Sequence, residues 1–331
     1  MRTLYVADQG AQVRKAGHVL RIELAGKCVG RISPQGLDHA FLFGNVSLTP
    51  QAIRLLMEER VSVGLLSGTG KLIGRITPAA RGWVSRRKAQ YAAADDPRYA
   101  LRFVRSVVRA KLSGCLGLLR RYRRNHGEVP IEAAVAGLQQ AKRALGEAED
   151  LAEVRAAEGR GSAAYFGCFR EVLRQGFAFE RRRRRPPPDP VNALLSLGYG
   201  LLRAEIEGQL EAVGLDPRVG FLHVERAGRP ALALDLIEEF RAAVVDRLVL
   251  RCVNLRVIGP EDFAIDEERG CRLTPDGLKT YLKQYDQQLS AVFLDLQGKR
   301  TCYRRILHRQ AREAAEAFTD RRAYRPFAAR L

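Results

Sequence analysis

A histidine and a group of carboxylates stand close together in one stretch of this 331-residue chain. His223 precedes a Gly-Arg-Pro turn, after which the apolar run 232–245 begins. Wound at 3.6 residues per turn, this run predicts a helix that is buried on most sides. One narrow wedge of the helix carries four acidic residues: Asp235, Glu238, Glu239 and Asp246. Because buried carboxylates need a cation or hydrogen-bond donors, and histidine is a common metal ligand, the wedge indicates ion-pair or metal chemistry.

A separate segment supplies another candidate ligand, Glu158, which stands among small residues. Asp235 and Glu238 lie three residues apart and so share one helix face. Two carboxylates and an imidazole make an oxygen-rich site that suits Mg²⁺ or Mn²⁺ and leaves positions for phosphate oxygens. Structural roles are the alternative, with Glu158 at the surface and Asp235 and Glu238 paired with Arg229 or Arg241.

Basic residues exceed acidic ones, with 56 Lys or Arg against 37 Asp or Glu and a net charge of +19. Such an excess favours a polyanionic partner. The competing explanation is a GC-rich genome, in which arginine codons are frequent. Two groups of arginines are either solvated faces or surfaces that follow DNA phosphates. They are the stripe Arg98, Arg102, Arg105 and Arg109 at helical spacing, and the run Arg181, Arg182, Arg183 and Arg184.

Other features of the sequence exclude several classes of protein. No stretch of eighteen uncharged apolar residues is present, which argues against a membrane span, and the first residues lack the apolar core of a signal peptide. The six cysteines are scattered without a Cys-x-x-Cys pair, so zinc ribbons and iron–sulfur clusters find no support. We therefore expect a cytoplasmic protein with reduced thiols and no membrane contact.

The hydrophobic pattern predicts an α+β multidomain protein. Residues 1–85 form a small β-rich domain with alternating strands, a short helix after Thr49-Pro50 and a final hairpin over 61–76. Residues 86–331 form a larger all-helical (all-α) domain, and it is expected to be the catalytic and DNA-binding one because it holds the candidate ligands and both groups of arginines. Its helices are predicted near 97–122, 130–156, 162–181, 190–213, 231–251, 274–295 and 300–318.

Three stretches occur in an order that resembles one known family. They are Glu158-Gly-x-x-Ser-Ala-Ala-Tyr-Phe, the run Arg-Pro-Pro-Pro-Asp-Pro-Val-Asn-Ala-Leu-Leu-Ser-Leu-Gly-Tyr ending at Tyr199, and Leu222-His223 leading to Leu-Ala-Leu-Asp-Leu-Ile-Glu-Glu-Phe-Arg. Tyr324-Arg-Pro-Phe327 is a weaker match. The chain resembles the CRISPR-associated integrase family, the near-universal DNA endonuclease/integrase of CRISPR adaptation, over essentially its whole length.

The resemblance implies a divalent metal, Mg²⁺ or Mn²⁺, held by a glutamate, a histidine and a third acidic residue. Motif matching places these ligands on Glu158, His223 and Glu238. Asp235 falls where several members carry a functional aspartate, and the family varies between Asp and Glu at the third ligand. Arg226 and Arg229 flank the path from His223 to Glu238 and are expected to contact the scissile phosphate.

The implied function is a metal-dependent DNA endonuclease/integrase that inserts short DNA fragments as new spacers at repeat boundaries by transesterification. The implied partners are double-stranded DNA, as captured fragment and repeat array, a second copy bound through the β domain, and a small second CRISPR-associated protein bridging two dimers. One rival is a non-enzymatic architectural nucleic-acid-binding protein, which leaves the carboxylate wedge without a role. A small-molecule metallohydrolase, the other rival, leaves the charge of +19 unexplained.

Overall fold

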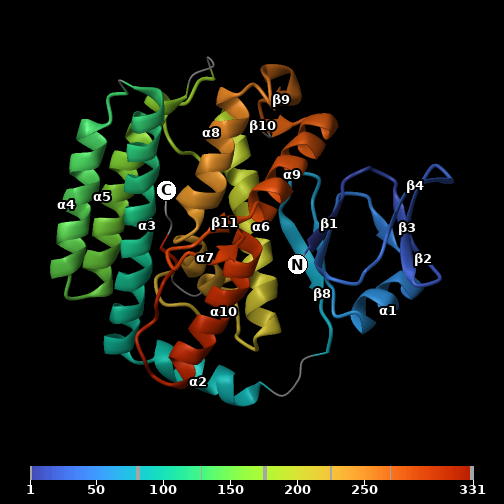
Figure 1. Ribbon diagram of the computed structural model, residues 1–331, viewed down its shortest axis with the longest axis horizontal. Coiled ribbons are helices and arrows are strands. Elements are labelled where there is room, and N and C mark those ends of the chain that lie inside the picture. Colours follow the sequence, from blue (N-terminus) through green and yellow to red (C-terminus); the bar gives the residue numbers. More distant parts are fainter. Residues whose placement is uncertain are drawn as a thin grey trace.

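The computed structural model of the chain describes residues 2–79, 83–127, 129–173, 177–223, 226–268 and 270–328. Strands gather in the N-terminal part and helices in the C-terminal part (Figure 1). The predicted order of a strand-rich region followed by a helical one is therefore confirmed. Within these described ranges, no helix is long and apolar enough to cross a membrane.

Residues 2–79 form two four-stranded sheets with strand orders β1-β5-β7-β8 and β4-β3-β2-β6. In the first sheet β1, β5 and β7 run parallel, and β8 pairs antiparallel with β7 as the predicted final hairpin. The bounds are β1 (Arg2–Val6), β2 (Gln12–Ala16), β3 (Val19–Leu24), β4 (Lys27–Ile32), β5 (Leu37–Phe43), β6 (Ser47–Leu48), β7 (Ser62–Leu66) and β8 (Leu72–Ile76).

The first sheet lies between the second sheet and the helices (Figure 1). Along β5 the side chains alternate, with Ala40 and Leu42 in the core next to the second sheet and Phe41 and Phe43 in the helical core. Because successive residues of a strand point to opposite faces, one strand contributes to both cores. The predicted short helix is α1 (Pro50–Glu58), whose N-terminus is capped by the Thr49 hydroxyl accepting from the Ala52 backbone N–H.

The C-terminal part packs its helices around α6, which is buried along most of its length (Figure 1). A π-helical turn over Arg241–Asp246 joins two of the helices, and short 3₁₀ turns cover Phe169–Val172 and Pro260–Asp262. The helices are α2 (Val84–Ala94), α3 (Pro97–His126), α4 (Glu132–Glu147), α5 (Leu151–Gly167), α6 (Pro190–Ala212), α7 (Ala231–Ile237), α8 (Arg247–Asn254), α9 (Pro275–Ser290) and α10 (Tyr303–Thr319).

The prediction that this part is all-helical is wrong in detail, because it also contains two small hairpins. They pair β9 (Phe263–Asp266) with β10 (Gly270–Leu273), and β11 (Phe293–Leu294) with β12 (Arg300–Thr301). Strands of two to four residues are too short for alternation to show in a sequence. The first hairpin is held by tertiary contact, since the Cys271 N–H donates to the Pro187 carbonyl at 2.8 Å.

Two predicted helices, over 130–156 and 162–181, have wrong boundaries. The first is divided into α4 and α5, because the Asp150 carboxylate accepts from the Glu153 N–H at 2.8 Å and begins a new helix. That helix then continues through Gly161 and ends at Gly167. A Cβ at Gly161 would lie 2.4 Å from Leu112, so this glycine allows α5 to approach α3 closely. Gly161 is thus a packing residue inside a helix, where the predicted helices left a gap between 156 and 162.

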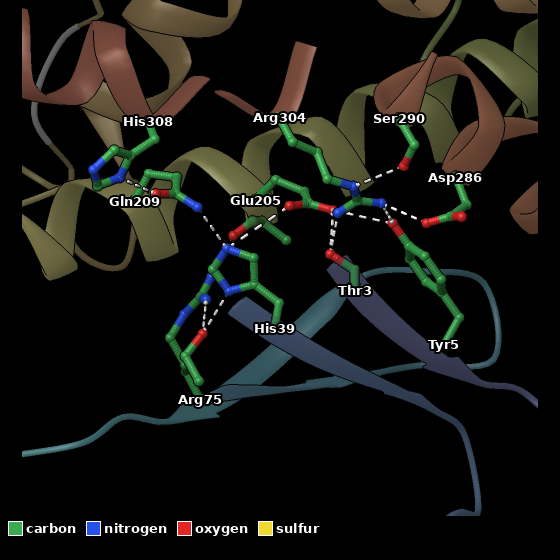
Figure 2. Close-up of polar contacts among 12 residues, drawn as sticks. Thr3, Tyr5, His39, Arg75, Glu205, Gln209, Asp286, Ser290, Arg304 and His308 are labelled. Carbon is green, nitrogen blue, oxygen red and sulfur yellow. Dashed lines mark hydrogen bonds and ion pairs between the residues drawn. The ribbon is translucent and has the colours of Figure 1, made fainter. Parts of the chain in front are cut away.

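A buried polar layer joins the first sheet to the helices (Figure 2). Glu205 of α6 accepts hydrogen bonds from the Thr3 hydroxyl at 3.2 Å and the Tyr5 hydroxyl at 3.0 Å, both on β1. Arg304 of α10 donates to Glu205 at 3.1 Å and to Asp286 of α9 at 2.6 Å. Burial opposes the ionisation of Glu205, but the Arg304 cation outweighs it and lowers the pKa of this carboxyl. Arg304 and its two carboxylate partners thus connect β1, α6, α9 and α10.

Candidate functional site

The segment before α7 places His223 by close backbone packing. A Cβ at Gly220 would lie 2.6 Å from the carbonyl carbon of Ala231, so the glycine is needed for this approach. The Leu232 N–H donates to the Pro217 carbonyl at 2.9 Å, which closes the segment against the start of the helix. Arg155 of α5 donates to the Leu222 carbonyl at 3.0 Å. The helix that carries Glu158 is thereby connected to the segment that carries His223.

Asp235 orients His223 from inside the protein. Its carboxylate accepts from the backbone N–H groups of Phe221, Leu222 and His223 at 2.6, 3.0 and 3.0 Å. It also lies 2.7 Å from the His223 Nδ1, so a neutral imidazole that donates there presents Nε2 as an electron-pair donor. Asp235 is fully buried and its oxygens already accept these four contacts. It therefore acts on His223 as a positioning residue.

The structure brings Glu158 of α5 and Glu238, which follows α7, onto one cation. Lys111 of α3 donates to Glu158 Oε1, and its Nζ lies 2.6 Å from Glu238 Oε2. The Ser162 hydroxyl, one turn further along α5, donates to Glu158 Oε1 at 2.8 Å. Two carboxylates that are 80 positions apart in the chain thus share a single ammonium group.

Electrostatics keep both carboxylates ionised. Burial favours the neutral acid at Glu238, but Arg241 and Lys111 outweigh it and hold the pKa of this carboxyl well below its usual range. Arg241 Nη1 donates to the two oxygens of Glu238 at 2.8 and 3.1 Å, and this pairing was one of the alternatives considered above. Burial also opposes ionisation at Glu158, where Lys111 again lowers the pKa.

The other two carboxylates of the predicted wedge accept hydrogen bonds inside the protein. Glu239 accepts from the Tyr324 hydroxyl at 2.7 Å and from the Phe327 N–H at 2.5 Å, and burial raises its pKa to about 8. Asp246 accepts from the hydroxyls of Tyr165 and Tyr199.

The prediction of one continuous helix over 231–251 is wrong, because a π-helical turn at 241–246 interrupts it. Such turns are frequent at functional sites.

A basic cavity of about 540 Å³ opens beside His223 and Glu238, and a second of about 470 Å³ opens beside Glu158 and Lys111. Arg182, Arg184 and Arg241 line both cavities, which therefore adjoin. Among the described residues around the first cavity, Glu238 is the acidic one and eight are basic: Lys71, Arg182, Arg184, Arg185, Arg203, Arg229, Arg241 and Arg272. This wall suits a chain of phosphates.

The predicted DNA-contacting arginines fall into three places. The stripe lies on α3, with Arg105 half-buried and the others, Arg98, Arg102 and Arg109, exposed. In the run before α6, Arg182 is held by Asn192 at 2.8 Å and Ser196 at 3.0 Å, while Arg181, Arg183 and Arg184 are exposed. Arg229 lines the first cavity and Arg226 is exposed.

The donor set fits a divalent cation that prefers oxygen, because two ionised carboxylates converge on one positive group and His223 lines the same cavity as Glu238. Glu158 and Glu238 would hold such an ion, with His223 as the nitrogen ligand. Across the described residues, no three His, Cys, Asp or Glu side chains are already grouped around one point as metal ligands.

Sequence reasoning did not identify Lys111 as part of this site. It lies on the apolar face of α3, flanked at helical spacing by Val107, Val108 and Cys115. A lone lysine on an otherwise apolar helix face needs a buried anion as partner, and this was the available signal. Lys71 and Arg203 gave no such signal, since only the fold carries them to the cavity.

Known proteins are similar to this chain over most of its length. The family model for CRISPR associated protein Cas1 matches residues 4–287. A Thermus thermophilus protein named CRISPR-associated endonuclease Cas1 3 is 37% identical over 334 residues, covering 99% of this chain and 97% of that protein. A Rhodospirillum rubrum protein named CRISPR-associated endonuclease Cas1 2 is 36% identical over 299 residues, covering 87% and 86%.

Solved structures share the fold. The chain matches a casposase bound to integration product with a TM-score of 0.87 at 24% identity, covering 99% of this chain and 94% of that one. It also matches a chain of a Cas6-RT-Cas1–Cas2 complex with a TM-score of 0.82 at 22% identity, covering 99% of this chain and 36% of that one. At these identities the likeness concerns the arrangement of helices and strands.

Proposed function

This chain belongs to the Cas1 family of CRISPR-associated proteins, and on that premise we propose that it is a metal-dependent DNA endonuclease/integrase. In the proposed reaction the 3′-hydroxyl of a captured DNA fragment attacks a phosphodiester at a repeat boundary, and the 3′ oxygen of the cut strand leaves. The products are a new fragment-to-repeat bond and a free 3′-hydroxyl. No protein nucleophile takes part.

One observation carries the proposal: Glu158 and Glu238 converge on a single cation where two basic cavities adjoin, and His223 lines the cavity that Glu238 lines. An ion-pair network with a purely structural role would not need an imidazole in the wall of a cavity. A phosphoryl-transfer site needs both anionic ligands for a cation and basic side chains for phosphates.

Each residue has a proposed role. Glu158, Glu238 and His223 would hold Mg²⁺ or Mn²⁺, which would neutralise negative charge that develops on the phosphate. Asp235 fixes the tautomer and the orientation of His223. Arg229 and Arg182, in the cavity wall, position the phosphates on either side of the cleaved bond.

The proposed partners follow from the relatives and from the charge. Double-stranded DNA, as fragment and repeat, is the polyanion that the charge of +19 favours. We propose a homodimer through the strand-rich domain, residues 1–85, with residues 86–331 as the catalytic domain. The match to a chain of a Cas6-RT-Cas1–Cas2 complex supports a small Cas2-type protein as a partner, and we propose that this partner bridges two dimers.

A strand-transfer assay tests the function. The purified protein, with a Cas2-type partner, is given a short DNA fragment with 3′-hydroxyl ends and a repeat-containing duplex. We expect joined products in Mn²⁺ or Mg²⁺ and none in EDTA, and cleavage of branched DNA under the same metal dependence. An architectural protein would bind DNA without joining it, and a small-molecule metallohydrolase would do neither.

Replacing Arg102, Arg105 and Arg109 together with alanine should weaken binding to every DNA sequence. Each phosphate contact that is lost should make the dependence of log K on log salt shallower by about one unit. Fluorescence anisotropy at several salt concentrations measures both quantities. Arg14, Arg54 and Arg60, in the strand-rich part, provide a control triple with the same loss of charge. If the triple variant on α3 keeps the affinity and the salt dependence of the wild type, the stripe is a solvated face and does not bind DNA.

A further inference from the structure

We propose that Lys111 is a built-in counterion that occupies the cation position between Glu158 and Glu238 until a divalent metal displaces it. The proposal rests on the proposed function, because it takes these two carboxylates as metal ligands. Lys111 belongs to α3, Glu158 to α5, and Glu238 follows α7, so three separate segments meet at one nitrogen atom.

The contacts define one shared position. The ammonium donates to Glu158 Oε1 and lies 2.6 Å from Glu238 Oε2, and its side chain is only 6% exposed. Two carboxylates brought this close repel each other unless a positive charge stands between them. The ammonium supplies that charge in the metal-free protein and so makes the converged arrangement stable.

The ammonium and a divalent ion exclude each other, because both need the same carboxylate oxygens. Metal binding therefore requires Lys111 to move away, and the loss of its two ion-pair contacts lowers the apparent metal affinity. The side chain has room to do so. Together with Glu158 and Ser162 it lines the cavity of about 470 Å³, and its stem is long and flexible.

Arg241 is a cation of a different kind in the same site. It donates to both oxygens of Glu238, and its guanidinium carbon lies over the Tyr199 ring, 4.1 Å from the ring centroid. A planar, always-charged group fixed on two sides stays in place when a metal binds. The exchangeable cation is therefore Lys111.

Metal titrations without DNA test the proposal on the full chain. Apo protein is titrated with Mn²⁺, and the free ion is followed by electron paramagnetic resonance. We expect Lys111→Met to bind Mn²⁺ at least about tenfold more tightly than the wild type, because one unit of competing charge at contact distance is removed. Lys111→Arg, which keeps the cation, should bind no more tightly than the wild type. Lys142→Met is the matched control, since Lys142 instead donates to the Ser113 hydroxyl at 2.9 Å.

Stability supplies a second measurement. In EDTA, Lys111→Met should melt below the wild type, because its buried carboxylates lack their counterion, and Mn²⁺ should raise its Tm by more than that of the wild type. Lys111→Gln keeps hydrogen-bond donors without the charge and replaces Lys111→Met if the latter does not fold. It should also bind Mn²⁺ more tightly than the wild type.

The outcomes separate this proposal from the proposed function. If the wild type binds Mn²⁺ and the neutral variants bind it no more tightly, the counterion role is wrong and the metal-dependent function stands. If neither the wild type nor the variants bind Mn²⁺, both the metal site and the counterion role are wrong. Tighter binding in Lys142→Met of the same size would assign the effect to general charge and also overturn the proposal.

Discussion

His223→Ala should reduce strand transfer by more than about 100-fold. Loss of a residue that only supports a metal ligand costs about 10- to 100-fold, and loss of the proposed ligand itself should cost more. The imidazole is held by Asp235 with Nε2 left to bind the metal, and alanine offers no nitrogen. DNA affinity should stay nearly unchanged, because the basic surface that supplies most of it is untouched. Gel-based strand transfer and fluorescence anisotropy on the same preparations measure the two effects.

Two further variants make this prediction sharper. Asp235→Asn should lose activity by about 10- to 100-fold, because the orientation of His223 suffers while the imidazole remains. His18→Ala changes an exposed histidine in the strand-rich part and should leave activity and binding unchanged. Equal losses of binding and activity in His223→Ala would assign a structural role to this histidine.

Glu205→Ala should destabilise the protein by about 3–5 kcal/mol, the usual cost of removing one partner of a buried ion pair. The Arg304 side chain is 3% exposed and would keep Asp286 but lose the carboxylate between β1 and α6 (Figure 2). The hydroxyls of Thr3 and Tyr5 would lose their acceptor as well. Urea unfolding followed by circular dichroism measures the loss.

A contrasting ion pair provides the control. Arg123 and Glu132 are paired at 2.6 Å but have largely exposed side chains. Glu132→Ala should therefore leave the urea midpoint close to that of the wild type, because water and salt screen exposed pairs. If Glu205→Ala unfolds at the same urea concentration as Glu132→Ala, the polar layer does not hold the sheet to the helices.

The periodic features of the sequence were sufficient for the coarse architecture. Alternating residues predicted the strands, and Thr49-Pro50 predicted a helix whose cap and first residue agree with the structure. Local patterns failed where tertiary contact decides, as at Gly161, which sits inside α5 because α3 approaches it. They also failed at the short hairpins and the π-helical turn, which leave no periodic signal.

The candidate site shows the same division. Sequence alone named Glu158, His223, Asp235 and Glu238 as candidates: carboxylates on an apolar helix require compensation, and the family resemblance selected Glu158 and His223 as well. Their separate roles depend on distances across the fold. Asp235 binds backbone N–H groups and His223, whereas Glu238 meets Glu158 through Lys111.

The sequence by itself determined the family, the order of strand-rich and helical regions, the positive charge and the residue types available for chemistry. These properties depend on composition and on neighbours along the chain. Only the tertiary structure decided which cation each carboxylate meets, which arginines line a cavity and how the sheet is joined to the helices. Those depend on contacts between residues far apart in the chain, and the energy of a buried charge is set by the partner that folding brings to it.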